Sequence, residues 1–148
     1  MNTPQRGRVL AVNISEAKGT RKTNIASCAV LRDFGLKDDA HGGPWHRQVS
    51  LLANESIEKM RRMGLNVSYG DFAENITTEG VDLVHLPVGT TIRIGGSVTL
   101  RVTQIGKVCH ERCAIYYQAG DCVMPKEGIF AEVGDEGEVK VGDEVMID

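Results

Sequence analysis

A cysteine with three potential cations beside it lies in the segment 106–113, GKVCHERC. Cys109 has Lys107 two positions before it, His110 directly after it and Arg112 three positions after it. Cationic neighbours lower the pKa of a thiol and favour the thiolate, the form that attacks, carries sulfur or binds a metal. A lone cysteine is more often a small buried hydrophobe, but these charged neighbours favour a reactive thiol at Cys109.

The other cysteines leave two further interpretations open. Cys113 and Cys122 complete a cluster of three, and such clustering indicates thiol chemistry or metal ligation rather than a structural disulfide. Together with His110 they could form a zinc site, although the chain offers one closely spaced pair where structural zinc usually uses two. Alternatively, they could be resolving thiols for Cys109. Cys28 precedes an apolar run and is predicted to be buried.

A second group of polar residues lies in the segment 38–48, DDAHGGPWHRQ, before a predicted strand. Arg47 provides a forked donor suited to phosphate, and the glycines allow the backbone to approach a ligand closely. His41 and His46 are five positions apart in a Gly-Pro loop, so no helical metal-binding spacing applies. The alternative is that Trp45 and His46 close one end of a barrel and Arg47 is a solvated charge. The residues alone leave both interpretations open.

The segment 69–77, YGDFAENIT, has the composition of a turn that leads into a strand. Asp and Asn side chains stabilise turns by hydrogen bonding to nearby backbone groups. Asp71 and Asn75 are therefore expected to stabilise the backbone here, and by itself the segment indicates no chemistry.

Short alternating segments separated by glycines predict a mostly β fold. The clearest helix is short, with Asn54 as its N-cap, Gly64 as its stop and an apolar stripe of Ile57, Met60 and Met63. Many short strands with one or two short helices predict a closed, mostly antiparallel β-barrel. The predicted strands are 9–14, 27–31, 48–53, 90–94, 98–105, 128–133, 138–141 and 144–147.

The length and the charge of the chain exclude several classes of protein. The 148 residues predict a single domain over 1–148. A net charge of -3 argues against nucleic acid as the main partner. No apolar run is long enough to span a bilayer, and the first residues lack the apolar region of a signal peptide. We therefore expect no membrane association and a cytoplasmic location.

Taken in order, these segments resemble the MOSC family, named for the C-terminal domain of molybdenum-cofactor sulfurase. The resemblance covers nearly the whole chain. The chain is therefore similar to small stand-alone bacterial MOSC proteins. The matching motifs are GLxxDxHG at 35–42, RQV at 47–49, GDFxENI at 70–76, LxVGTxIxIG at 86–95, CHxxC at 109–113 and GDCVMPxxGIF at 120–130.

The resemblance implies a MOSC-like closed β-barrel and a functional family cysteine, which corresponds best to Cys109. In the family that cysteine is thought to carry sulfur as a persulfide or, in amidoxime-reducing relatives, to ligate molybdenum. Those relatives bind the phosphate of molybdopterin through basic residues, for which Arg47 and Lys107 are the candidates. This chain departs from them in its additional Cys113 and Cys122 and in lacking their N-terminal extension. It also contains no cysteine-desulfurase domain and no identifiable pyridoxal phosphate site.

We therefore predict a protein that binds the molybdenum cofactor, or carries sulfur for its sulfuration or for metal-sulfur cluster assembly. Cys109 is the predicted catalytic residue and molybdenum ligand. His41, Arg47 and Lys107 are expected to line one basic pocket beside it, because a thiolate and a phosphate both need local positive charge. The complete set of predicted cofactor-binding residues is His41, Arg47, Asn75, Lys107 and Arg112.

Two other functions remain open. One is a molybdenum-dependent reductase of N-hydroxylated compounds, and the other is a non-enzymatic binding module with a Cys/His zinc site. The expected protein partners are those of molybdenum-cofactor biosynthesis or the molybdoenzymes themselves.

Overall fold

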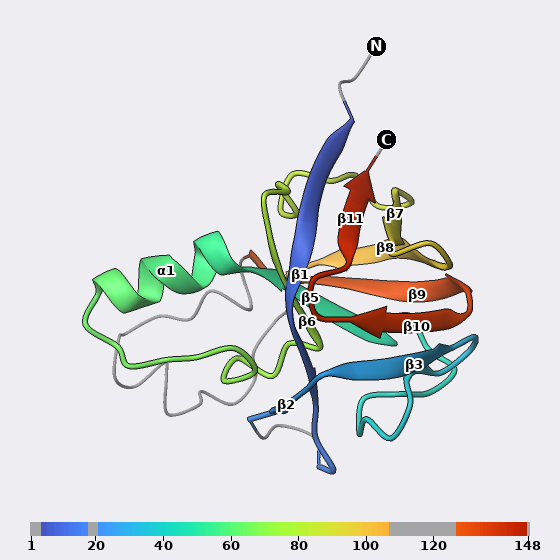
Figure 1. The fold of residues 1–148 in the computed structure, drawn as a ribbon, viewed down its shortest axis with the longest axis horizontal. Coiled ribbons are helices and arrows are strands. Elements are labelled where there is room, and N and C mark those ends of the chain that lie inside the picture. The colour runs from blue at the N-terminus through green and yellow to red at the C-terminus, as the bar shows by residue number, and fades with distance from the viewer. Residues whose placement is uncertain (1–3, 18–20, 107–126, 148) are drawn as a thin grey trace.

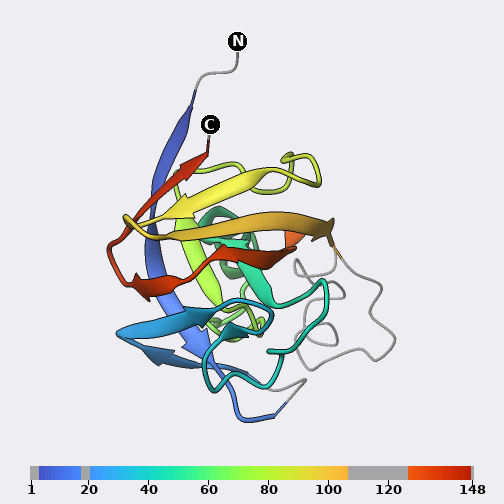
Figure 2. The ribbon, with the colours of Figure 1, turned by 90° about the vertical axis from the view of Figure 1, so that its right-hand side faces the viewer.

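A computed structural model describes residues 4–17, 21–106 and 127–147. Within these residues seven strands close into a β-barrel, as predicted, and one helix projects from its side (Figures 1 and 2). The elements are β1 (Gln5–Ile14), β2 (Thr23–Ile25), β3 (Ser27–Leu31), β4 (Gly35–Leu36), β5 (Val49–Ala53), α1 (Asn54–Arg62), β6 (Ile76–Glu79), β7 (Thr91–Ile94), β8 (Val98–Ile105), β9 (Ile129–Asp135), β10 (Gly137–Lys140) and β11 (Glu144–Ile147).

The barrel runs β1-β6-β5-β9-β8-β7-β11 and is closed by the pairing of β11 with β1. Its described strand pairs are antiparallel except β5 and β6, which are parallel and are joined through α1. A parallel pair needs such a crossover, because its second strand must start at the same end as its first. Strands β10, β3 and β4 form a small second sheet, and β3 lies beside β10 below β9 in Figure 1.

The alternation of apolar and polar residues along β8 correctly predicts which face of the strand is buried. Val98, Leu100 and Val102 are buried in the barrel core, whereas Arg101 between them is exposed. The predicted glycine turn at 95–97 joins β7 to β8. The period of two in a strand therefore sets which residues fill the barrel.

Helix α1 differs from the prediction at its N-terminus and agrees with it at its C-terminus, where Met63 is the C-cap and the predicted stop Gly64 follows with a φ of +94°. Its N-cap is Ala53, which makes no side-chain cap, so Asn54 is the first helical residue and not the cap. Ile57 and Met60 are buried as predicted, but Met63 is 56% exposed, because the helix ends before it and its side chain leaves the apolar stripe. No helix of the described segments is long and apolar enough to cross a membrane.

A second hydrophobic cluster lies outside the barrel core. It brings the apolar side of α1 together with side chains from β5, β9 and the 67–72 segment. Its buried members are Leu52, Ile57, Met60, Val67, Phe72 and Phe130. Two of these rings, Phe72 and Phe130, also reach the pocket described below.

The ladder between β8 and β9 continues to the point where the described chain is interrupted. Ile105 pairs with Ile129, and the Gly106 N–H donates to Gly128 O at 2.6 Å. The described ends on either side of the segment 107–126 are therefore neighbours.

Candidate functional site

A small pocket lies where the loop before β5 meets the turn before β6. Its volume is about 40 Å³, and segments far apart in the sequence form its wall. The lining residues are His41, Trp45, Arg47, Ser50, Phe72, Ala73 and Phe130. Two of the predicted cofactor-binding residues, His41 and Arg47, thus line the same pocket.

Arg47 lies against two aromatic rings of this pocket. Its Cζ lies 5.1 Å from the centroid of the Trp45 ring and 5.5 Å from that of Phe130. Its Nε is buried and has no hydrogen-bond partner among the described residues. The rings stabilise the cation but offer no strong acceptor, so the Nε–H is available to a ligand. Arg47 is a half-buried pocket residue and not a solvated charge.

The loop that carries His41 is held by hydrogen bonds and by close packing of one ring. Trp45 Nε1 donates to His41 O at 2.8 Å, and the Gly43 N–H donates to Phe34 O at 2.8 Å. A Cβ on Gly42 would lie 2.3 Å from the Phe34 ring. At Gly42 the missing side chain therefore makes room for Phe34, rather than for the ligand that the sequence suggested.

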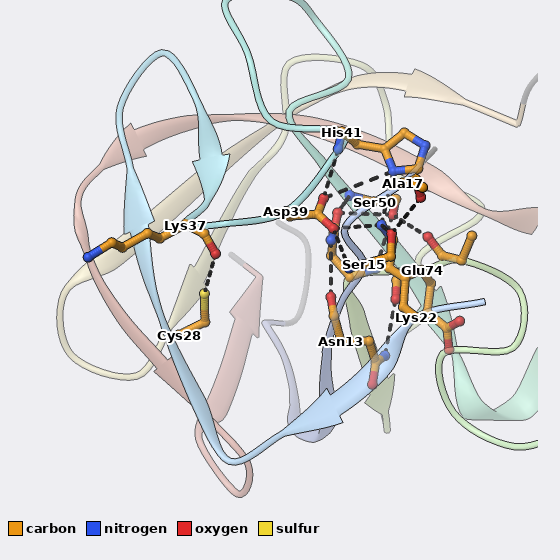
Figure 3. A network of polar contacts seen from close by, with 12 residues as sticks. Asn13, Ser15, Ala17, Lys22, Cys28, Lys37, Asp39, His41, Ser50 and Glu74 are labelled. Atoms are coloured by element: carbon orange, nitrogen blue, oxygen red, sulfur yellow. Dashed lines mark hydrogen bonds and ion pairs between the residues drawn. The ribbon is translucent and has the colours of Figure 1, made fainter. Parts of the chain in front are cut away.

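Behind His41 lies a buried ion pair. Lys22 Nζ is 2.7 Å from Asp39 Oδ1, and both side chains are 0% exposed. The same ammonium lies 3.1 Å from Ser15 Oγ and 2.9 Å from His41 Nδ1 (Figure 3). A buried charge is tolerated only when it is paired and hydrogen-bonded, so these contacts fix the His41 loop to the residues that follow β1.

The environment of Asp39 favours its ionised form. Burial raises the pKa of this carboxyl, but the Lys22 and Asn75 side chains and the Ser15 amide outweigh burial and hold the pKa below its usual value. The Ser15 N–H donates to Asp39 Oδ1 at 3.0 Å, and the His41 N–H donates to Oδ2 at 3.3 Å. Asp39 is therefore a carboxylate that organises the loop.

Asn75 supports the pocket from behind through Ser50. Asn75 is fully buried, its Oδ1 accepts from the Ser50 N–H at 2.9 Å, and its Nδ2 donates to Asn13 O at 3.2 Å. Asp71 Oδ2 accepts from the Ser68 N–H at 2.9 Å. The expectation that Asp71 and Asn75 stabilise the backbone is confirmed, and direct contact of Asn75 with a cofactor stays a prediction.

His46 joins the pocket loop to the end of β8. Its Nε2 lies 2.8 Å from Gln104 Oε1, and Gln104 pairs with Phe130 across the β8–β9 ladder. The end of β8, with Gly106 directly after it, therefore belongs to the same side of the barrel as the pocket loop.

Among the four cysteines, the described residues include only Cys28. It is buried as predicted, its Sγ lies 3.5 Å from Lys37 O, and burial raises the pKa of the thiol. The described segments contain no group of three or more His, Cys, Asp or Glu side chains that could hold a metal ion. The other predicted thiols and cations lie outside the described residues: Lys107, Cys109, Arg112, Cys113 and Cys122.

Several residues of the site were not predicted from the sequence. Lys22 lies in a segment that the sequence analysis did not single out, and nothing in its sequence neighbours pointed to a partner 17 positions away. Phe130 lies in a predicted strand, where an aromatic residue normally indicates core packing. The one available signal was the motif that places Asp39 two positions before His41.

Comparison with known proteins identifies the family of the chain. The MOSC domain model matches residues 37–146, which include every residue that lines the pocket. The chain belongs to the MOSC domain family. MOSC domains are associated with molybdenum-cofactor-related proteins. Lys22 lies outside the region matched to the MOSC domain.

Solved structures show the same fold at low sequence identity. The YuaD protein from Bacillus subtilis is 18% identical, with a TM-score of 0.81 over 99% of this chain and 98% of that chain. YiiM from Geobacillus stearothermophilus is 18% identical, with a TM-score of 0.68 over 96% of this chain and 75% of that chain. YiiM from Escherichia coli is 17% identical, with a TM-score of 0.67 over 97% and 69%. A search of curated proteins gives no match.

Proposed function

We propose that this MOSC domain binds the molybdenum cofactor, with the phosphate of molybdopterin in the pocket of His41 and Arg47. The observation that carries the proposal is the Arg47 guanidinium, which lies against two rings with its buried Nε lacking a partner among the described residues. A fixed guanidinium is a strong donor for a phosphate, because charge-assisted hydrogen bonds gain strength where water is excluded.

The donors of the pocket fit an anion. Arg47 supplies a positive charge in a chain whose net charge is -3, so the local positive charge does not follow from overall composition. Ser50 also lines the pocket, but its Oγ lies within hydrogen-bond distance of Asn75 Oδ1 and Ala73 O, so its proton already has acceptors inside the protein. Arg47 and His41 are therefore the described residues that would hold the phosphate.

Cys109 is the thiol that we propose to face the bound cofactor. Gly106 is anchored to Gly128, two positions from the Phe130 ring that stacks on Arg47. In the sequence Cys109 follows the anchored Gly106 by three positions, with Lys107 and Arg112 as further cations close to it.

The chemistry proposed for Cys109 is sulfur carriage. The Cys109 thiolate takes the terminal sulfur of a separate protein persulfide, and the donor leaves as its own thiolate, so no external oxidant or reductant is required. When bound, the cofactor supplies the molybdenum centre that accepts the sulfur. The partners are proteins of molybdenum-cofactor biosynthesis or molybdoenzymes, and the proposed location is the cytoplasm.

Cofactor content tests this proposal. The wild-type protein and the Arg47→Ala variant are purified from a molybdenum-replete host, and their molybdenum, zinc and pterin contents are measured. We expect pterin in the wild type and at least a ten-fold lower content in Arg47→Ala, because a lost charged hydrogen bond weakens binding by about that factor. The control is Arg101→Ala, since Arg101 is 63% exposed and pairs loosely with Glu132. Zinc without pterin would favour the binding module and contradict the proposal.

A further inference from the structure

The Lys22 ammonium constrains the chemical state of His41. Each of the three N–H bonds of an ammonium is a donor, and none is an acceptor. Asp39 Oδ1, Ser15 Oγ and His41 Nδ1 lie 2.7, 3.1 and 2.9 Å from Lys22 Nζ. Each of these three described atoms can accept one of the ammonium's donors, and the Lys22 and Asp39 side chains are fully buried.

His41 can take part in this arrangement in one tautomer only. Because Lys22 donates, His41 Nδ1 must accept, and the proton of the neutral ring is then on Nε2. A proton on Nδ1 would point at the ammonium 2.9 Å away. Asp39 Oδ2, 4.0 Å from Nδ1, is the nearest described carboxylate to the ring, and its hydrogen bond comes from the His41 backbone.

We infer that Lys22 is a positioning residue which, together with Asp39, keeps His41 as an Nε2–H donor to the pocket. The inference rests on the proposed function in taking an oxyanion as the ligand. With Nε2–H and the Arg47 Nε–H both donating, the ring supplies no acceptor to an acidic O–H group. The pocket therefore favours the dianion of a phosphate over the monoanion, which carries one more acidic O–H group. Lys22 acts through His41 and does not line the pocket itself.

The chain contains an internal reference for the tautomer. His85 Nδ1 lies 2.7 Å from Asp82 Oδ2, and because an ionised carboxylate only accepts, Nδ1 of His85 carries its proton. His41 and His85 should therefore show opposite protonation of Nδ1 in the same molecule. Nitrogen NMR of the full chain with ¹⁵N-labelled histidine distinguishes a protonated ring nitrogen from an unprotonated one.

The first measurement uses the wild-type protein without ligand near neutral pH. We expect an unprotonated Nδ1 and a protonated Nε2 for His41, with a protonated Nδ1 for His85. A protonated Nδ1 on His41 would overturn the inference, whatever the protein binds. In the double variant Lys22→Met/Asp39→Asn, which removes both buried charges, the Nδ1 signal of His41 should shift and that of His85 should not.

The second measurement titrates inorganic phosphate into the same samples. We expect the His41 Nε2 and Arg47 Nε signals of the wild type to move together, with more tightly bound phosphate above the pH at which phosphate loses its second proton. The double variant should bind phosphate at least about ten-fold more weakly. If His41 has the expected tautomer but neither its Nε2 signal nor that of Arg47 Nε responds to phosphate, the pocket is not an anion site. The proposed function would then be wrong as well. Equal affinity in wild type and folded double variant would overturn the role of Lys22 alone.

Discussion

Lys22 Nζ lies 2.7 Å from Asp39 Oδ1 with both side chains fully buried, so a charge pair inside the protein holds the loop that carries His41. Replacing one partner leaves the other charge buried without compensation. Lys22→Met should therefore lower the free energy of unfolding by about 3–5 kcal/mol, measured by urea denaturation near neutral pH. The double variant Lys22→Met/Asp39→Asn should lose less than the single variant. A single variant as stable as the wild type would contradict this prediction.

The same pair predicts the response to acid. The pKa of Asp39 is lower in the folded protein than in the unfolded chain, so its stabilising contribution is complete above the unfolded value of about 3.9. That contribution is lost as the pH falls through the lower folded value. The difference in unfolding free energy between wild type and Asp39→Asn should be constant from about pH 7 to pH 5 and shrink below about pH 4. A difference that widens with acid would show that the pKa is shifted the other way.

Because the Phe34 ring packs against Gly42, adding one methyl group at this position should destabilise the protein. A Cβ at Gly42 would lie 2.3 Å from the ring, so Gly42→Ala should lower the free energy of unfolding by about 1–3 kcal/mol. Gly96 is a matched control in the β7–β8 turn, since a Cβ there would meet nothing within 4 Å. Gly96→Ala should change stability by less than about 0.5 kcal/mol. Thermal or urea unfolding compares the two, and equal losses would contradict the packing described for Gly42.

The cysteines should differ in their reaction with a thiol alkylator. Cys28 is buried, and burial raises the pKa of its thiol, so it should react slowly in the folded protein. Cys109, among Lys107, His110 and Arg112, is expected to label first of the four near neutral pH. Brief alkylation followed by peptide mass spectrometry measures the order, with Cys109→Ser as the control. Labelling of Cys109 last would remove it as the functional thiol.

The sequence predicted strands and turns better than it predicted the contacts of the site. Alternation placed Val98, Leu100 and Val102 on the inner face of β8, because strand period and burial are both local properties. The parallel pairing of β5 with β6 was not foreseen, since it depends on where α1 returns the chain. The ion pair of Lys22 with Asp39 likewise depends on how β2, β3 and β4 return the chain, which brings residues 17 positions apart into contact.

The candidate site was predicted only in part, because some of its contacts are local in the sequence and others depend on the fold. His41 and Arg47 share a loop, and their residue types already suggested an anion site, which the shared pocket supports. The two rings near Arg47 come from different parts of the chain: Trp45 is two positions away in the sequence, whereas Phe130 lies on β9. A local pattern contains no information on the second contact, and so the half-buried state of Arg47 followed only from the fold.

The most direct test of the account is whether the cofactor binds through its phosphate at Arg47. Binding of isolated molybdopterin cofactor to the protein is measured with and without competing inorganic phosphate, for wild type, Arg47→Lys and the exposed control Arg101→Lys. Lysine keeps the charge but loses the planar, forked guanidinium that lies near the Trp45 and Phe130 rings. We predict that phosphate competes, that Arg47→Lys binds about ten-fold more weakly or worse, and that Arg101→Lys binds like the wild type. Binding that neither phosphate nor Arg47→Lys weakens would contradict the account.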